Sequence, residues 1–164
     1  MKIKNVLLIL LSIVSYTVVC AQNTDLGKLS EQERQEYLIE LGKDLTKTFG
    51  PGYYREYKEP IILEVEKFSD NDKRPEIQKN IGREYYTVIF PYDESKEELD
   101  FPYASRVRVW KDTGEPLDVT FGNGYGKNFL FTSYKTMKML NKDEQVPYQQ
   151  AKKYKSCKEL KKEE

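Results

Sequence analysis

The clearest hydrophobic pattern in the chain lies in residues 106–121, where two short alternating runs flank Asp112, Thr113 and Gly114. Alternation on both sides of a turn-forming tripeptide predicts a β-hairpin. A three-residue loop with Gly114 in the left-handed conformation sets the register. That register pairs Lys111 with Glu115, Trp110 with Pro116, Val109 with Leu117, Arg108 with Asp118, and Val107 with Val119.

The two strands of this hairpin agree on which face is buried. One face carries only aliphatic residues, namely Val107, Val109, Leu117 and Val119. The opposite face carries Arg106, Arg108, Trp110, Asp118 and Thr120. Proline lacks the N–H that a central strand would use, so Pro116 indicates that its strand lies locally at a sheet edge.

Upstream of the hairpin, helical spacing predicts one amphipathic helix. Ser30 and Glu33 form a capping box at its start, and Gly50 followed by proline ends it. Gly42 weakens the helix and permits close approach of a strand. The predicted buried stripe comprises Leu38, Leu41, Leu45 and Phe49.

Further β-type runs are expected at residues 61–68, 83–90 and 128–134, with polar connections at 69–80 and 93–100. In the first of these, Leu63 and Val65 alternate with glutamates, as in a half-buried strand. The predicted fold class is therefore α+β, with one N-terminal amphipathic helix packed on an antiparallel sheet of about five strands. This element order is similar to the cystatin-like and NTF2-like groups. The analogy covers element order only, and no residue role carries over.

The first residues have the layout of a secretory signal peptide. A basic start and an apolar run precede small residues at positions 19–21, which predicts cleavage before Gln22. The predicted organisation is a signal peptide at 1–21, a mobile lead-in at 22–29, one domain at 30–140, and a polar, partly helical tail at 141–164. Localisation is then secreted or periplasmic. The alternative is an envelope lipoprotein anchored through Cys20.

Composition removes several classes of function. The 164-residue chain has 27 basic and 27 acidic residues and no histidine. A balanced charge does not favour nucleic acid as a partner, and the absence of histidine removes the commonest general base and metal ligand. Cys157 alone would remain after cleavage, so no internal disulfide is expected.

Candidate catalytic motifs have simpler explanations. The Asp-Thr-Gly at 112–114 matches aspartic proteases but is fully explained as a turn. The glycines at 122, 124 and 126 lack the spacing of a phosphate-binding loop. The acidic stretch 93–100 lacks the ligand pattern of a calcium loop. We therefore predict no cofactor, no metal site and no catalytic residue.

Aromatic and arginine residues supply the remaining signal, because such residues anchor interfaces and stack on sugars. Arg106, Arg108 and Trp110 share the polar face of the hairpin, and Tyr125 lies in the next turn. These four residues are the predicted ligand-binding site of a secreted, non-catalytic binding module for a protein or a glycan, with no membrane span in the mature chain. The alternative is a small NTF2-like hydrolase or lyase that uses a pocket carboxylate.

Overall fold

The computed structural model describes residues 24–56, 58–140 and 144–150. In chain order the helical elements before the sheet are η2 (Leu26–Lys28), α2 (Glu31–Phe49) and η3 (Pro51–Tyr53). The strands are β1 (Ile61–Ile62), β2 (Glu66–Lys67), β3 (Glu84–Phe90), β4 (Ser105–Trp110), β5 (Pro116–Phe121) and β6 (Gly126–Asn128), with helices α3 (Pro75–Gln78) and α4 (Tyr134–Leu140). This confirms the predicted α+β class.

Helix α2 begins and ends where the sequence predicts. The Ser30 side chain accepts a hydrogen bond from the Glu33 N–H, and Glu33 accepts one from the Ser30 N–H, which completes the capping box. Leu38, Leu45 and Phe49 are fully buried. At Gly42, a Cβ atom would lie 2.6 Å from the Phe90 ring, so this glycine permits the close approach of α2 to β3.

The sheet is antiparallel and has six strands in the order β1–β3–β4–β5–β6, with β2 also paired to β3. The predicted strand at 61–68 is thus divided into β1 and β2. The register shifts by one residue between the pair Ile62–Val88 and the pair Glu66–Tyr85, which indicates a β-bulge. Leu63 and Val65 are 43% and 37% exposed, more than a half-buried strand would give.

The β4–β5 hairpin confirms the predicted pairs of Arg108 with Asp118 and of Val107 with Val119. The register then shifts, so that Val109 pairs with Pro116 instead of Leu117. Gly114 has the expected positive φ of 68°, but the Trp110 N–H donates to the Glu115 carbonyl, which makes the loop one residue longer than predicted. The bulge turns Leu117 to the opposite face, where it joins a second hydrophobic cluster.

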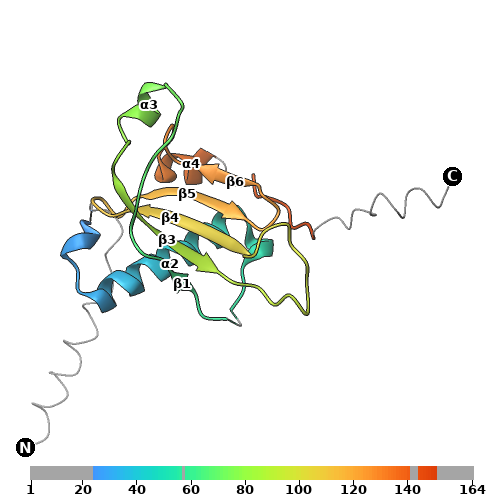
Figure 1. The fold of residues 1–164 in the computed structure, drawn as a ribbon. Helices are drawn as coiled ribbons and strands as arrows, with labels where there is room; N and C mark the ends of the chain where they lie inside the picture. Colours follow the sequence, from blue (N-terminus) through green and yellow to red (C-terminus); the bar gives the residue numbers. More distant parts are fainter. Residues whose placement is uncertain (1–23, 57, 141–143, 151–164) are drawn as a thin grey trace, which may run out of the picture.

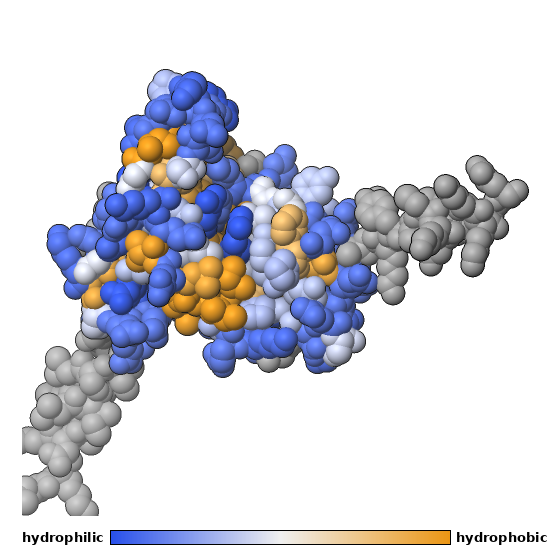
Figure 2. Space-filling view, in the orientation of Figure 1, coloured by the Kyte–Doolittle hydropathy of each residue, from blue (hydrophilic) through white to orange (hydrophobic). Residues whose placement is uncertain are grey.

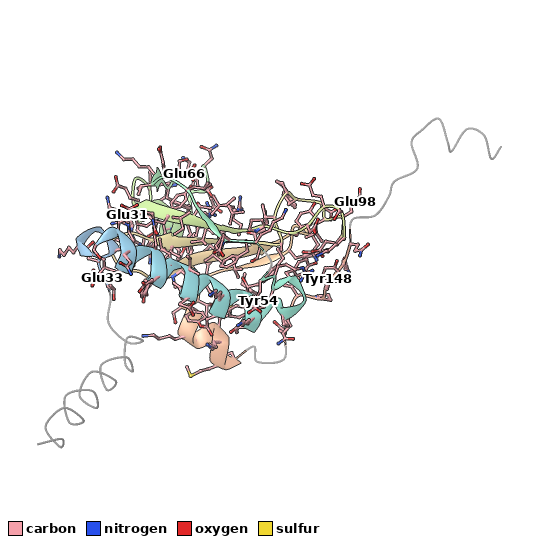
Figure 3. The ribbon with its side chains drawn as sticks, turned by 90° about the horizontal axis from the view of Figure 1, so that it is seen from below. Glu31, Glu33, Tyr54, Glu66, Glu98 and Tyr148 are labelled. Carbon is pink, nitrogen blue, oxygen red and sulfur yellow. The ribbon has the colours of Figure 1, made fainter. Side chains whose placement is uncertain are left out.

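The main core lies between α2 and one face of the sheet (Figure 1). Val107, Val109, Val119 and Phe121 are fully buried there, as the hairpin pattern predicts for three of them. Figure 3 shows α2 along this side of the sheet and Glu66 on the other side. The sheet therefore has an inner face toward α2 and an outer face away from it.

The segments flanking the predicted domain are packed against it. Thr24 and Leu26, in the predicted lead-in, donate backbone hydrogen bonds to the hairpin turn, and Leu26 is fully buried. Residues 144–150 are not helical; Val146 donates to the Phe49 carbonyl, and the Tyr53 hydroxyl donates to the Pro147 carbonyl. The predicted last strand at 128–134 is mostly a turn between β6 and α4. The predicted signal peptide and Cys20 lie outside the described residues.

Candidate binding surface

Three of the four predicted site residues lie side by side on the outer face of β4. Arg106, Arg108 and Trp110 alternate with Val107 and Val109, which point to the core. The alternation in the sequence therefore placed these side chains on the correct face. It did not predict how much of each one is covered.

Trp110 is only 5% exposed, which contradicts the expectation of an accessible aromatic anchor. Its ring packs edge-on against Phe68 at 5.5 Å and Tyr85 at 6.3 Å, and the Arg83 guanidinium lies over it at 4.1 Å. The second cluster consists of Phe68, Ile77, Tyr85, Trp110 and Leu117, with Leu130 packed on it. Trp110 is thus a core residue. It is covered by residues of the segment 68–82 and by Leu130 in the turn after β6.

Arg108 is occupied by its neighbour across the hairpin. Its Nε lies 3.0 Å from each carboxylate oxygen of Asp118, and a second nitrogen also donates to that carboxylate. Burial lowers the pKa of Arg108, but the hydrogen bonds and charge of Asp118 outweigh it, so the net shift of the Arg108 pKa is upward. Only 24% of the Arg108 side chain and 9% of the Asp118 side chain are exposed. The charges of Arg108 and Asp118 therefore compensate each other.

Arg106 differs from Arg108 in that it is not paired with a carboxylate among the described residues. Its guanidinium lies over the Tyr103 ring at 5.5 Å, and it makes no ion pair with any described residue. Its Nε is buried and has no hydrogen-bond partner among the described residues. The same holds for the hydroxyl of Thr87, a residue only 3% exposed that lies on the outer face of the adjacent strand β3. Buried polar atoms without partners are uncommon and costly.

Aliphatic side chains extend the outer face beyond Arg106. Strand pairing places Ile61, Ile89, Arg106 and Thr120 in one row across β1, β3, β4 and β5. Ile61 and Leu63 are 51% and 43% exposed, and Figure 2 shows an apolar area over β1 and β3 on this side. We call this part of the outer face the open face; it comprises the exposed Ile61 and Leu63, the half-buried Ile89, Arg106 and Thr120, and the buried Thr87 between them.

Tyr125 belongs to a separate feature. It is 67% exposed in the β5–β6 turn and lines a hollow of about 390 Å³ with Asn123, Lys127 and residues 144–147 and 149. No residue of the open face lines this hollow. The structure therefore brings Arg106 and Arg108 together but does not bring Tyr125 into the same site.

Among the described residues, the two most buried carboxylates form ion pairs with arginines. Asp118 is held by Arg108, and Glu97 is held at 2.6 Å by Arg55 and accepts a hydrogen bond from the Tyr148 hydroxyl. Within residues 24–56, 58–140 and 144–150, no group of three acidic or cysteine side chains is arranged to hold a metal ion. In the same part of the chain no helix has the length and apolar character needed to cross a membrane.

Sequence reasoning missed Thr87, Ile61, Leu63 and Ile89 as members of this surface. Thr87 stands out in the run Tyr85–Phe90 as the one polar residue, which is the signal that was available. No known family model matches the chain, and neither a curated protein nor a solved structure matches it.

Proposed function

We propose that this chain is a secreted or periplasmic, non-catalytic binding module that docks a protein partner on its open face. The observation that carries the proposal is the exposure of Ile61 and Leu63 beside Arg106 on a sheet face that is covered elsewhere. Exposed apolar side chains that gather in one patch mark interaction sites, and arginine is enriched in protein interfaces. The secretory location follows from the signal-peptide pattern at residues 1–21 and is part of the proposal.

A protein partner is favoured over a glycan for a physical reason. Sugars bind to exposed aromatic rings, and the ring expected to serve that role, Trp110, is covered by Phe68 and Tyr85. The open face offers aliphatic side chains, whose burial against another protein removes apolar surface from water. Glycan binding is therefore the alternative that an experiment must exclude.

The alternative of a hydrolase or lyase has weaker support from the geometry. A general acid or base needs a carboxylate in a pocket with room for substrate. The well-buried carboxylates of Asp118 and Glu97 are both engaged by arginine side chains. These ion pairs contribute to the stability of the fold. They leave neither carboxylate available as a proton donor or acceptor.

The test begins with a photo-crosslinking residue in place of Ile61, followed by identification and purification of the captured protein. Binding is then titrated with the unmodified chain, with Leu63→Glu and with Ile81→Glu. Leu63 and Ile81 are each 43% exposed, so the second variant is a matched control outside the open face. We expect Leu63→Glu to weaken binding about tenfold or more and Ile81→Glu to leave it unchanged. Equal affinities for the two variants, or binding of a glycan panel that Leu63→Glu does not affect, would refute the proposal.

A further inference from the structure

The charge on the open face is uneven, and this restricts what can dock there. Arg108 is neutralised by Asp118, whereas Arg106 has no ion-pair partner among the described residues. The open face therefore presents one uncompensated positive charge. The Arg106 Nε is already buried, and no residue in the described part of the chain accepts a hydrogen bond from it.

An apolar partner alone would be a poor match for this surface. Covering Arg106 with aliphatic groups would remove the remaining water from its guanidinium and leave a buried, unpaired charge. A carboxylate would remove that penalty, because it accepts two parallel hydrogen bonds from a guanidinium. The buried Thr87 hydroxyl, which also has no hydrogen-bond partner in the part of the chain that the structure describes, lies on the same face of the next strand.

The neighbours of Arg106 indicate what should flank the carboxylate. Ile89 is paired with Arg106 across β3 and β4, and Ile61 is paired with Ile89 across β1 and β3. Leu63 lies two residues along from Ile61 on the same face. A partner side chain that reaches Arg106 would therefore be accompanied by groups in contact with aliphatic carbon.

If the open face is the binding surface, as proposed above, we infer that its partner is a protein segment in which an aspartate or glutamate is flanked by aliphatic residues. The carboxylate pairs with Arg106, and the flanking side chains cover Ile61, Leu63 and Ile89. This defines the partner by its chemistry, as an acidic and aliphatic peptide segment.

The experiment uses two short peptides, acetyl-Leu-Glu-Leu-amide and acetyl-Leu-Gln-Leu-amide, which differ essentially in one charge. Each is titrated into isotopically labelled full-length protein while the Arg106 Nε–H and the Ile61 and Leu63 methyl resonances are followed by NMR. The variant is Arg106→Gln. The matched control is Arg34→Gln, since Arg34 lies over the Tyr86 ring at 5.6 Å, much as Arg106 lies over Tyr103.

We expect the glutamate peptide to shift all three resonances and to bind about tenfold more tightly than the glutamine peptide. Arg106→Gln should abolish that preference, and Arg34→Gln should retain it. If Arg106→Gln does not fold, Arg106→Lys keeps the charge but loses the two-pronged donor and should reduce the preference. Equal binding of both peptides at Ile61 and Leu63 would overturn the carboxylate inference while leaving the open face as a binding surface. No shift of any open-face resonance with either peptide would count against both.

Discussion

Truncation of Trp110 is the sharpest test of how the outer face is organised. Trp110→Ala removes a ring that packs against Phe68 and Tyr85 and lies under the Arg83 guanidinium at 4.1 Å. The residue is 5% exposed. The structure therefore predicts a loss of stability, whereas an accessible binding residue would show a loss of affinity.

The expected size follows from comparable core truncations. Replacing a buried large aromatic residue with alanine costs about 3–5 kcal/mol, and a partly exposed cation–π contact adds about 0.5–1 kcal/mol. A whole domain is stable by only about 5–15 kcal/mol. Trp110→Ala is thus expected to be close to unfolding, so Trp110→Phe, with an expected cost of about 1–2 kcal/mol, is measured beside it.

The assay is urea denaturation followed by far-UV circular dichroism, because the substitution removes the only tryptophan in the chain. Tyr125→Ala is the matched control. Tyr125 is 67% exposed, and its truncation should change the free energy of unfolding by less than about 0.5 kcal/mol. The denaturant slope m should be similar in all folded variants, which shows that the comparison concerns stability.

Trp110 is not a core residue of the second cluster if Trp110→Ala costs less than about 1 kcal/mol, the size expected for a surface residue. The same conclusion follows if Trp110→Phe keeps its stability but loses affinity for a protein captured at the open face. Either result would return Trp110 to the role of a binding anchor. The expected result is a stability defect in both variants and unchanged affinity in Trp110→Phe.

Three other predictions test separate parts of the structure. Thr87→Val should raise the free energy of unfolding by about 1 kcal/mol in urea denaturation. It replaces a buried hydroxyl, which has no hydrogen-bond partner among the described residues, with an isosteric apolar group. A loss of stability would contradict this. Gly42→Ala should destabilise the fold by about 1–3 kcal/mol in the same assay, despite the gain in helix propensity. The reason is that the alanine Cβ would lie 2.6 Å from the Phe90 ring. A gain in stability would show that the ring moves freely. Burial and the Asp44 carboxylate raise the pKa of Tyr134 to about 12. The contribution of Tyr134 to folding stability is therefore complete below pH 10 and is lost as the pH rises toward 12. In a tyrosinate absorbance titration, Tyr134→Phe should remove the latest ionisation step and leave the earlier steps in place.

The elements with strong local signals were predictable from the sequence. The capping box of Ser30 and Glu33 defines the start of α2, because both hydrogen bonds form within four residues. Gly114 was predictable because the turn requires positive φ. Strand alternation likewise placed Arg106 and Arg108 on the outer face, since side chains alternate between faces along a strand.

The bulge in β5 was not predictable from the hairpin alone. A one-residue shift turns a side chain to the other face, so Leu117 moved from the inner core to the cluster with Trp110. What favours that arrangement is Phe68 and Ile77, which lie on a segment far from the hairpin in sequence. The alternation of apolar and polar residues in the hairpin does not predict that these distant residues cover its outer face.

The same distant cover determines where a binding surface remains. Phe68 and Ile77 bury the Trp110 end of the outer face, whereas Ile61 and Leu63 stay exposed at the other end. A partner strand added at the β1 edge would meet the register shift between β1 and β2, which interrupts the row of backbone groups that such pairing needs. Docking across the side chains of the face has no such obstacle. It would also bring a hydrogen-bond acceptor within reach of Arg106. A strand added at the β1 edge would not do so, because β1 lies two strands away from β4, which carries Arg106.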